Sequence, residues 1–168
     1  MQYYVLAAVV LALDQLTKWA VKTNMALYEA IPVIGDFFQI YSHRNRGAAF
    51  GILQNQRLFF VIVTIFVLAA AFLYLRRAIR RSDRLLAVAL SLLIGGAAGN
   101  FVDRALFGEV VDFFKFRFQF DWFGTPVDYT YPIFNVADIA IVSSVALILL
   151  DSLLAWRREK KEMMRNDG

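Results

Sequence analysis

A carboxylic acid stands within a segment that is otherwise suited to lipid. Residues 131–150, YPIFNVADIAIVSSVALILL, carry Asn135 and Asp138 near the start of a long apolar run. A charge within a membrane span is costly, so an acid at such a position indicates a functional site by default. No basic residue stands three or four positions away to neutralise Asp138. This acid is therefore expected to be protonated or to face a water-filled cavity.

The other polar residues of the apolar runs have structural explanations beside functional ones. Asp14 and Lys18 stand four positions apart on one helix face, where they can form an ion pair that is either structural or part of a site. Asn100 can join two helices through a hydrogen bond. Asp103 and Arg104 follow at the end of the same run, where they can anchor the helix at the membrane surface.

Composition excludes several kinds of catalytic site. The chain has no cysteine, which removes disulfides, thiolate metal ligands and a cysteine nucleophile. Its single histidine, His43, cannot form a multi-histidine metal site within one chain, and we expect neither a metal nor a cofactor. No serine accompanies Lys18 in a way that suits a serine–lysine peptidase. Asp112 heads an aromatic segment much as Asp36 does, and composition alone favours neither acid.

Four apolar runs must position these residues. The 168-residue chain is 60% hydrophobic, whereas a typical soluble domain is about 45–50% apolar. Runs of roughly 18 helical residues, at ~1.5 Å each, approach the ~30 Å of a hydrocarbon core. The run 58–75 has no charged residue and lacks the polar stripe of a soluble bundle helix. We expect one all-α membrane domain over 1–168, with transmembrane helices at about 3–21, 58–75, 85–102 and 133–156.

Basic residues predict the orientation of these helices. The link RRAIRRSDR at 76–84 and the tail from 157 onward are densely basic, whereas the other two links are longer and more dilute. By the positive-inside rule, both termini and the short link are cytoplasmic. The net charge of +4 is then an orientation signal, and nucleic-acid binding is not expected. The first run has neither a basic start nor a cleavage site, which indicates a retained helix rather than a signal peptide.

In this topology, all the charged and amide side chains that are unfavourable within a membrane span fall in the outer leaflet. The inner halves of the spans hold only hydroxyl groups, such as those of Ser91, Ser143 and Ser144, which can bond to their own helix. A transporter or proton channel needs a polar path through both leaflets, so this distribution counts against one. A non-catalytic scaffold would explain the spans but not the unpaired Asp138. The pattern predicts a site at the extracytoplasmic face.

The two outer links predict a small sheet. Residues 35–41, GDFFQIY, are similar to residues 111–117, VDFFKFR, and the second segment goes on to alternate aromatic with polar or basic residues. A turn signal, NRG, follows the first segment at 45–47. We expect two similar strands in a β-rich extracytoplasmic element that rests on the outer membrane surface. A short interfacial helix is expected at 47–53.

Five motifs run along the chain in the order LDQLTK at 13–18, NRGAAFG at 45–51, GGAAGNFVDR at 95–104, VVDFF at 110–114 and FNVADIAI at 134–141. Together they resemble the motifs of the lipoprotein signal peptidase family (signal peptidase II, or prolipoprotein signal peptidase), whose members are bacterial membrane aspartic endopeptidases. The motifs follow the order of that family across nearly the whole chain, together with four matching spans. Position 139 is often a small residue in the family and is Ile139 here, which bears on the shape of the nearby pocket.

The resemblance implies both the chemistry and the substrate. Its catalytic pair corresponds to Asp112 and Asp138, which would share one proton, so that one acid activates a water and the other hydrogen-bonds the scissile carbonyl. The implied substrate is a prolipoprotein with a diacylglyceryl-modified cysteine, cut just before that cysteine at the outer face of the bacterial inner membrane. Membrane lipid is the other expected partner, and we expect a monomer. The supporting residues are expected to be Asp14, Lys18, Asn45, Gly47, Asn100, Asp103, Arg104 and Asn135.

Overall fold

The computed structural model describes residues 1–47 and 54–166 of the chain, with side chains as far as residue 163. Its helices are α1 (Gln2–Asn24), α2 (Arg57–Arg80), α3 (Arg84–Phe107) and α4 (Val136–Asn166). Its strands are β1 (Ala30–Ile34), β2 (Phe38–Asn45), β3 (Val110–Trp122) and β4 (Thr125–Thr130). The four predicted spans are confirmed as helices that are long and apolar enough to cross a membrane. The term all-α is too narrow, because four strands accompany these helices.

The start of α4 differs from the expected one at residue 133. The Asn135 side-chain oxygen accepts a hydrogen bond from the Asp138 backbone N–H at 3.0 Å, and the Asp138 carboxylate accepts one from the Asn135 backbone N–H at 3.0 Å. This reciprocal pair is a capping box, which begins the helix at Val136. Asp138 therefore stands at the third helical position, where the helix dipole favours a negative charge, and not a full turn inside the helix.

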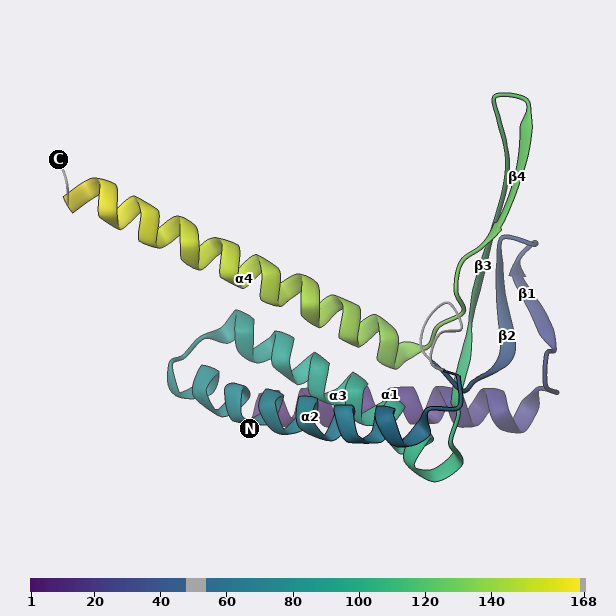
Figure 1. Cartoon of the computed structure of the whole chain (residues 1–168), viewed down its shortest axis with the longest axis horizontal. Coiled ribbons are helices and arrows are strands. Elements are labelled where there is room, and N and C mark those ends of the chain that lie inside the picture. Colours follow the sequence, from purple (N-terminus) through teal and green to yellow (C-terminus); the bar gives the residue numbers. More distant parts are fainter. Residues whose placement is uncertain (48–53, 167–168) are drawn as a thin grey trace.

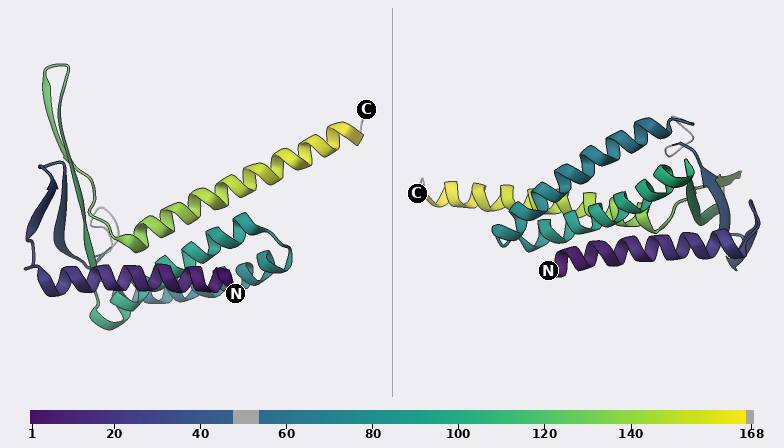
Figure 2. Two further views of the ribbon diagram at one scale, coloured as in Figure 1. Left: turned by 180° about the vertical axis from the view of Figure 1, so that it is seen from behind. Right: turned by 90° about the horizontal axis from the view of Figure 1, so that it is seen from below.

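The helices meet at one end of the molecule, beside the sheet. Figures 1 and 2 show α1, α2 and α3 lying side by side, with the sheet standing across the ends of the helices. Helix α3 packs against each of the other three. Helix α4 starts at the sheet and diverges from the bundle toward its C-terminus (Figure 1). Both termini and the α2–α3 link lie at the end opposite the sheet.

Glycines allow α3 to occupy this central position. Gly95 and Gly99 face α1, and Gly96 faces α4. A Cβ atom on Gly95 would lie 2.7 Å from the Ala7 backbone oxygen, and one on Gly96 would lie 2.6 Å from the Ala137 backbone oxygen. These distances leave no room for a methyl group. Small residues four positions apart let membrane helices approach closely, and this approach brings the polar groups of three helices together.

A methyl group at Gly99 is expected to destabilise the protein. Its Cβ would lie 2.3 Å from a carboxylate oxygen of Asp14, whose side chain is fully buried. Over-packing of this kind typically costs ~1–3 kcal/mol, because neighbouring groups must shift. Gly99→Ala should therefore lower the thermal midpoint of the purified protein in detergent by roughly 2–12 °C. An unchanged midpoint would contradict the close contact between α1 and α3.

The sheet has the order β1-β2-β3-β4, and every pair of neighbours is antiparallel. The two similar segments predicted from the sequence lie in adjacent strands, with Phe38 opposite Phe116 and Gln39 opposite Lys115. Beyond Phe38, the first residue of β2, β3 continues with β4 as a hairpin that projects from the rest of the sheet (Figure 1). The interfacial helix expected at 47–53 falls almost entirely on residues outside the described ranges.

Candidate active site

A cavity of about 460 Å³ lies where α3, β3 and the start of α4 meet. Asp112 and Asp138 both line it, so the structure brings together two acids that are 26 residues apart in the sequence. Asp36, the look-alike of Asp112, is exposed in the turn between β1 and β2. The cavity is also lined by Asn45, Asn100, Arg104, Val110, Tyr131, Pro132, Ile133, Phe134, Ile139, Ile141, Val142 and Ser143.

Asp112 is held by amide groups inside the protein. Its side chain is 2% exposed, one carboxylate oxygen accepts from the Asn45 amide at 3.0 Å, and the other accepts from the Asn135 amide at 2.7 Å. Burial and, to a smaller extent, the negative charge of Asp138 together raise the pKa of Asp112 to about 7, against the opposing effect of the two amide donors. Near neutral pH, Asp112 can therefore hold a proton.

Asp138 has a different environment at the N-terminus of α4. One carboxylate oxygen accepts from the Asn100 side-chain amide at 2.8 Å, and the other accepts the capping hydrogen bond from Asn135. Asn135 thus donates to both acids, to Asp112 through its side chain and to Asp138 through its backbone. This bridge holds two carboxyl groups in one cavity, which is the arrangement that permits one protonated and one ionised acid.

A buried ionic cluster lies behind the wall of the cavity. The Lys18 ammonium lies 2.7 Å from Asp14 and 2.9 Å from Asp103, and it donates to the Asn100 carbonyl oxygen at 2.8 Å. The predicted Asp14–Lys18 pair is therefore confirmed. Asp14 also accepts from the Ala137 backbone N–H at 2.9 Å, which links α1 to α4. Asp103 is 4% exposed and faces this cluster, so it is not the surface anchor considered from the sequence.

Arg104 holds the chain segment that follows β2. Its guanidinium donates to the Gly47 carbonyl oxygen at 3.0 Å and lies 4.7 Å from the centre of the Phe60 ring. The Gly47 N–H in turn donates to the Asn45 side-chain oxygen at 2.9 Å. Because that oxygen is occupied, the Asn45 amide nitrogen faces Asp112. Arg104 and Gly47 therefore fix the orientation of a side chain that contacts Asp112.

Gln15 is a supporting residue that the sequence analysis missed. Its amide nitrogen lies within hydrogen-bonding distance of Asp14 at 3.2 Å, of the Gly99 backbone oxygen at 3.2 Å and of Asp103 at 3.3 Å. It therefore connects the ionic cluster to the backbone of α3. The available signal was its place as an uncharged polar residue within the first apolar run, next to Asp14.

Comparisons with known proteins agree with this geometry. Residues 6–154 match the model of a family described as Signal peptidase (SPase) II. The chain belongs to the signal peptidase II family. A lipoprotein signal peptidase of Bacillus pumilus (strain SAFR-032) is 47% identical over 161 residues, which cover 96% of this chain and 98% of the relative. The lipoprotein signal peptidase of Bacillus subtilis (strain 168) is 46% identical over 162 residues, which cover 96% of this chain and 99% of that relative.

Two solved structures share the fold of this signal peptidase II chain. Each is a bacterial membrane enzyme whose structure was determined by the in meso method. The one at 2.3 Å resolution has a TM-score of 0.81 and 40% identity, covering 96% of this chain and 92% of that chain. The one at 1.9 Å resolution has a TM-score of 0.75 and 40% identity, and the match covers 90% of this chain and 92% of that chain. The resemblance drawn from the five motifs is confirmed, and the chain is a membrane protease.

Proposed function

We propose that this signal peptidase II releases signal peptides from diacylglyceryl-modified prolipoproteins by cutting just before the lipidated cysteine. Removal of signal peptides from prolipoproteins follows from the family and from the names of its relatives. One observation carries the finer proposal: two acids share a cavity whose lining continues along the lipid-facing part of α4. Ile139 and Val142 line that cavity and are also exposed on the helix surface. A substrate embedded in lipid can therefore reach the two acids laterally, from within the membrane.

Asp112 and Asp138 are the proposed catalytic pair. Asp138, at the helix N-terminus and with its carboxylate held by two N–H donors, is suited to take a proton from the attacking water. Asp112, which is buried and has its pKa raised to about 7, can hold a proton near neutral pH and is suited to hydrogen-bond the scissile carbonyl oxygen. The water oxygen then bonds to the carbonyl carbon, the C–N bond breaks, and the amine leaves with the transferred proton. The amides of Asn45, Asn100 and Asn135 hold both acids in place.

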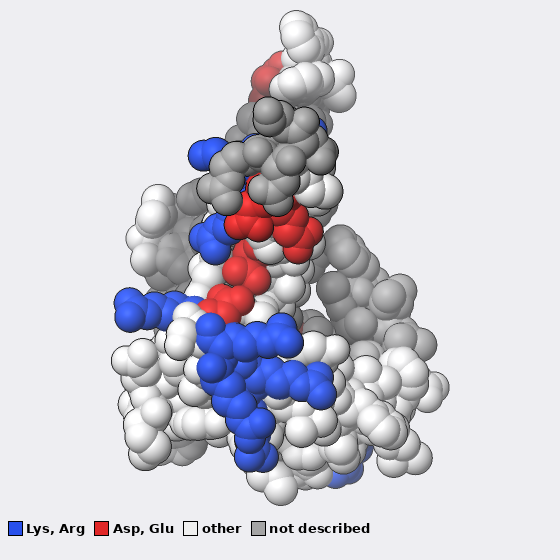
Figure 3. Space-filling view, turned by 90° about the vertical axis from the view of Figure 1, so that its left-hand side faces the viewer, with Lys and Arg blue, Asp and Glu red and all other residues white. Residues whose placement is uncertain are grey.

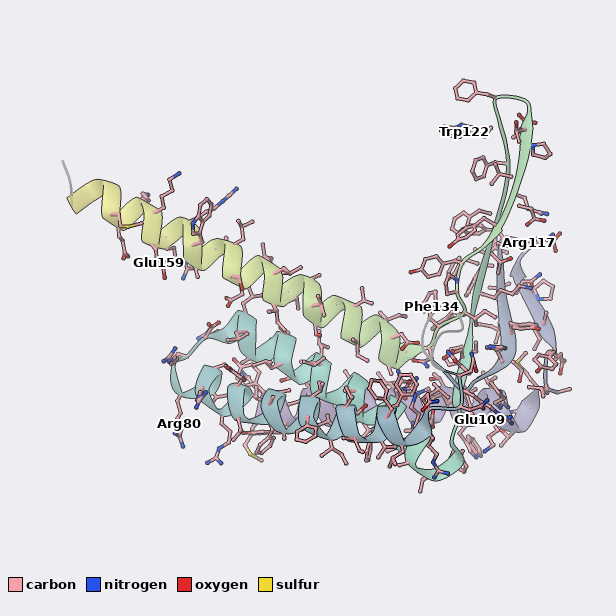
Figure 4. All side chains as sticks on the ribbon, in the orientation of Figure 1. Arg80, Glu109, Arg117, Trp122, Phe134 and Glu159 are labelled. Carbon is pink, nitrogen blue, oxygen red and sulfur yellow. The ribbon has the colours of Figure 1, made fainter. Side chains whose placement is uncertain are left out.

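The protein is proposed to cross the bacterial inner membrane four times with the site at the outer face. Figure 3 shows Lys and Arg side chains gathered at the end of the molecule that lies opposite the sheet. In Figure 4, Arg80 and Glu159 mark that end, whereas Glu109, Phe134 and Arg117 lie at the end with the sheet. The positive-inside rule assigns the arginine-rich end to the cytoplasm. We further propose that residues 1–168 form one domain and act as a monomer.

The outer hairpin supports the proposal that the sheet rests on lipid. Phe118, Phe120 and Trp122 alternate along β3 and are 38%, 48% and 61% exposed. Trp122 lies near the tip of the hairpin, on the side toward α4 (Figure 4). The intervening residues Gln119 and Asp121 are polar, as is the preceding Arg117, which pairs with Asp128 of β4. A ribbon with one aromatic face and one polar face suits the boundary between lipid and water, where Trp and Tyr gather.

Topology can be tested with a reporter that is active only outside the cytoplasm. Insertion between residues 22 and 57, or between 105 and 131, should give an active reporter, because both links would be extracytoplasmic. Insertion at Ser82, between α2 and α3, or fusion at the C-terminus should give an inactive one. Reporter activity measured in whole cells distinguishes the orientations, and the reverse pattern would contradict a site at the outer face.

The rate of cleavage should fall as the pH rises above about 7. The pKa of Asp112 is raised to about 7, so the acid is protonated below that pH and loses its proton above it. Since the proposed mechanism needs this proton, kcat/KM should decline about tenfold per pH unit once Asp112 is ionised. The measurement is kcat/KM for a lipidated substrate in detergent from pH 6 to pH 10. A constant value across this range would exclude Asp112 as the proton-holding acid.

The function itself is tested with purified components. The protein in detergent should cleave a diacylglyceryl-modified prolipoprotein and leave the same precursor intact when its cysteine is unmodified. Mass spectrometry of the released signal peptide locates the cut. Cleavage at another bond, or equal cleavage of the unmodified precursor, would contradict the proposed substrate.

A further inference from the structure

Lys18 contacts a neutral side chain, that of Asn100, in addition to its two acidic partners. The residue is 2% exposed, and an ammonium group has three N–H donors and no acceptor. Lys18 forms ion pairs with Asp14 (2.7 Å) and Asp103 (2.9 Å), and it donates a hydrogen bond to the side-chain oxygen of Asn100 (2.8 Å). Two partners balance its charge, whereas the third is neutral and lines the cavity. The contact with Asn100 is therefore the one that connects the cluster to the site.

This contact determines which way the Asn100 amide faces. Only its carbonyl oxygen can accept a hydrogen bond from an ammonium group, so that oxygen must face Lys18. The amide nitrogen is thereby directed at Asp138, to whose carboxylate it donates at 2.8 Å. Asn135 also donates to the Asn100 oxygen, at 3.2 Å, which reinforces the same orientation. An amide turned by 180° would set its N–H groups against the ammonium and its oxygen against the carboxylate.

We propose that Lys18 is a positioning residue for cleavage, which acts through Asn100 to keep an N–H donor on Asp138 and so holds Asp138 as the ionised base. The proposal rests on the assignment of Asp138 to the catalytic pair. It gives the buried cation a role in the reaction besides its role in joining α1 to α3. Lys18 itself lies outside the cavity lining and touches no reacting atom.

Other charged groups also act on Asp138, and the test must separate them from Lys18. Asp112 of β3 and Arg104 of α3 lie close enough to interact with it electrostatically. Asp14 of α1 and Asp103 of α3 lie beside Lys18 and oppose its charge. Two carboxylates and one ammonium give the cluster a formal charge of −1. A variant that removes Lys18 alone would change this charge and leave buried acids unpaired, which risks unfolding.

The double variant Lys18→Met/Asp103→Asn removes the contact between Lys18 and Asn100, and it leaves the formal charge of the cluster at −1 because one cation and one acid are lost together. Asp14 is then the only acid left in the cluster, and it keeps the hydrogen bonds from the Ala137 backbone N–H and the Gln15 amide. Without its ammonium partner, the Asn100 oxygen keeps only the 3.2 Å hydrogen bond from Asn135, so the amide is less firmly held toward Asp138. We expect kcat to fall roughly 10- to 150-fold, as for the loss of a hydrogen bond to a charged group, with KM little changed. The acid limb of the pH profile of kcat should move to higher pH, because the base is less easily ionised.

Two further variants make the result specific. Asp103→Asn alone keeps the contact between Lys18 and Asn100, so its acid limb should remain in the wild-type position. The Asn100→Leu variant has no amide to orient. Adding Lys18→Met/Asp103→Asn to it should therefore move the acid limb of the kcat profile no further. Thermal midpoints and size-exclusion profiles in detergent show whether each variant is folded, and the Asn100→Leu comparison is made between folded proteins.

Several outcomes would overturn the proposal. A folded double variant with wild-type kcat and acid limb would show that the contact has no part in the reaction. If Asp103→Asn alone moved the acid limb of the kcat profile as far as the double variant does, the charge of the cluster would act on the site without Asn100. The same conclusion would follow if the double change moved the acid limb by its full amount in the Asn100→Leu background. Failure of the proposed function looks different: Asp138→Asn would then retain activity. With Asp138→Asn inactive, a negative result for Lys18 refutes the positioning role alone.

Discussion

Asp112→Asn and Asp138→Asn should each abolish cleavage of a diacylglyceryl-modified substrate while leaving a folded, monodisperse protein. An amide can neither accept the proton of the attacking water nor donate a carboxylic proton to the scissile carbonyl. Loss of one general acid–base group typically costs about 10²–10⁴ in rate. Folding should survive at position 138, because an Asn side-chain oxygen can still accept the hydrogen bond from the Asn135 backbone that begins α4.

The double variant and a matched control complete this experiment. Two residues that act as one unit are not additive, so Asp112→Asn/Asp138→Asn should be little slower than either single variant. Asp36→Asn is the control, because this acid begins a similar aromatic segment but is exposed in the β1–β2 turn, outside the cavity lining. It should retain most of its activity. Substantial turnover by Asp112→Asn, or an inactive Asp36→Asn, would refute the proposed pair.

Substitution of Asn135 should separate its structural role from its role in the site. A serine hydroxyl can still accept from the Asp138 backbone N–H and cap α4, but it cannot replace the amide that donates to Asp112 at 2.7 Å. Asn135→Ser should therefore keep most of the stability. Its rate should fall roughly 10- to 150-fold, since a hydrogen bond to a charged or proton-sharing group is worth ~1.5–3 kcal/mol.

Asn135→Ala is the matched comparison, because it removes the cap as well as the donor. Loss of an N-cap typically costs about 0.5–2 kcal/mol, so this variant should have a lower thermal midpoint than Asn135→Ser and a comparable loss of kcat. Both quantities are measured on the purified protein in one detergent. If Asn135→Ser cleaved at the wild-type rate, the side-chain bridge between the two acids would have no catalytic importance.

Sequence alone was sufficient for the features that depend on local pattern. The uncharged run 58–75 predicted a helix that the structure describes as Arg57–Arg80, because the length and polarity of a span are properties of consecutive residues. The similar segments 35–41 and 111–117 indicated two strands, which are neighbours in the sheet. The order of five motifs indicated the signal peptidase II family, and with it the proposed pair, before any contact between Asp112 and its partners was known.

Tertiary structure decided which acids meet and what each one touches. Asp36 and Asp112 have similar neighbours in the sequence, yet one is exposed in a turn and the other is buried among amides, because strand pairing and helix packing place them in different surroundings. Asp138 has no recognisable partner in the sequence, because the groups that bind it are remote in the chain or belong to the backbone. Asn100 comes from α3, the capping N–H comes from Asn135, and both donate to it. Such long-range contacts exist only after the glycines of α3 have let three helices pack closely, so no local pattern could specify them.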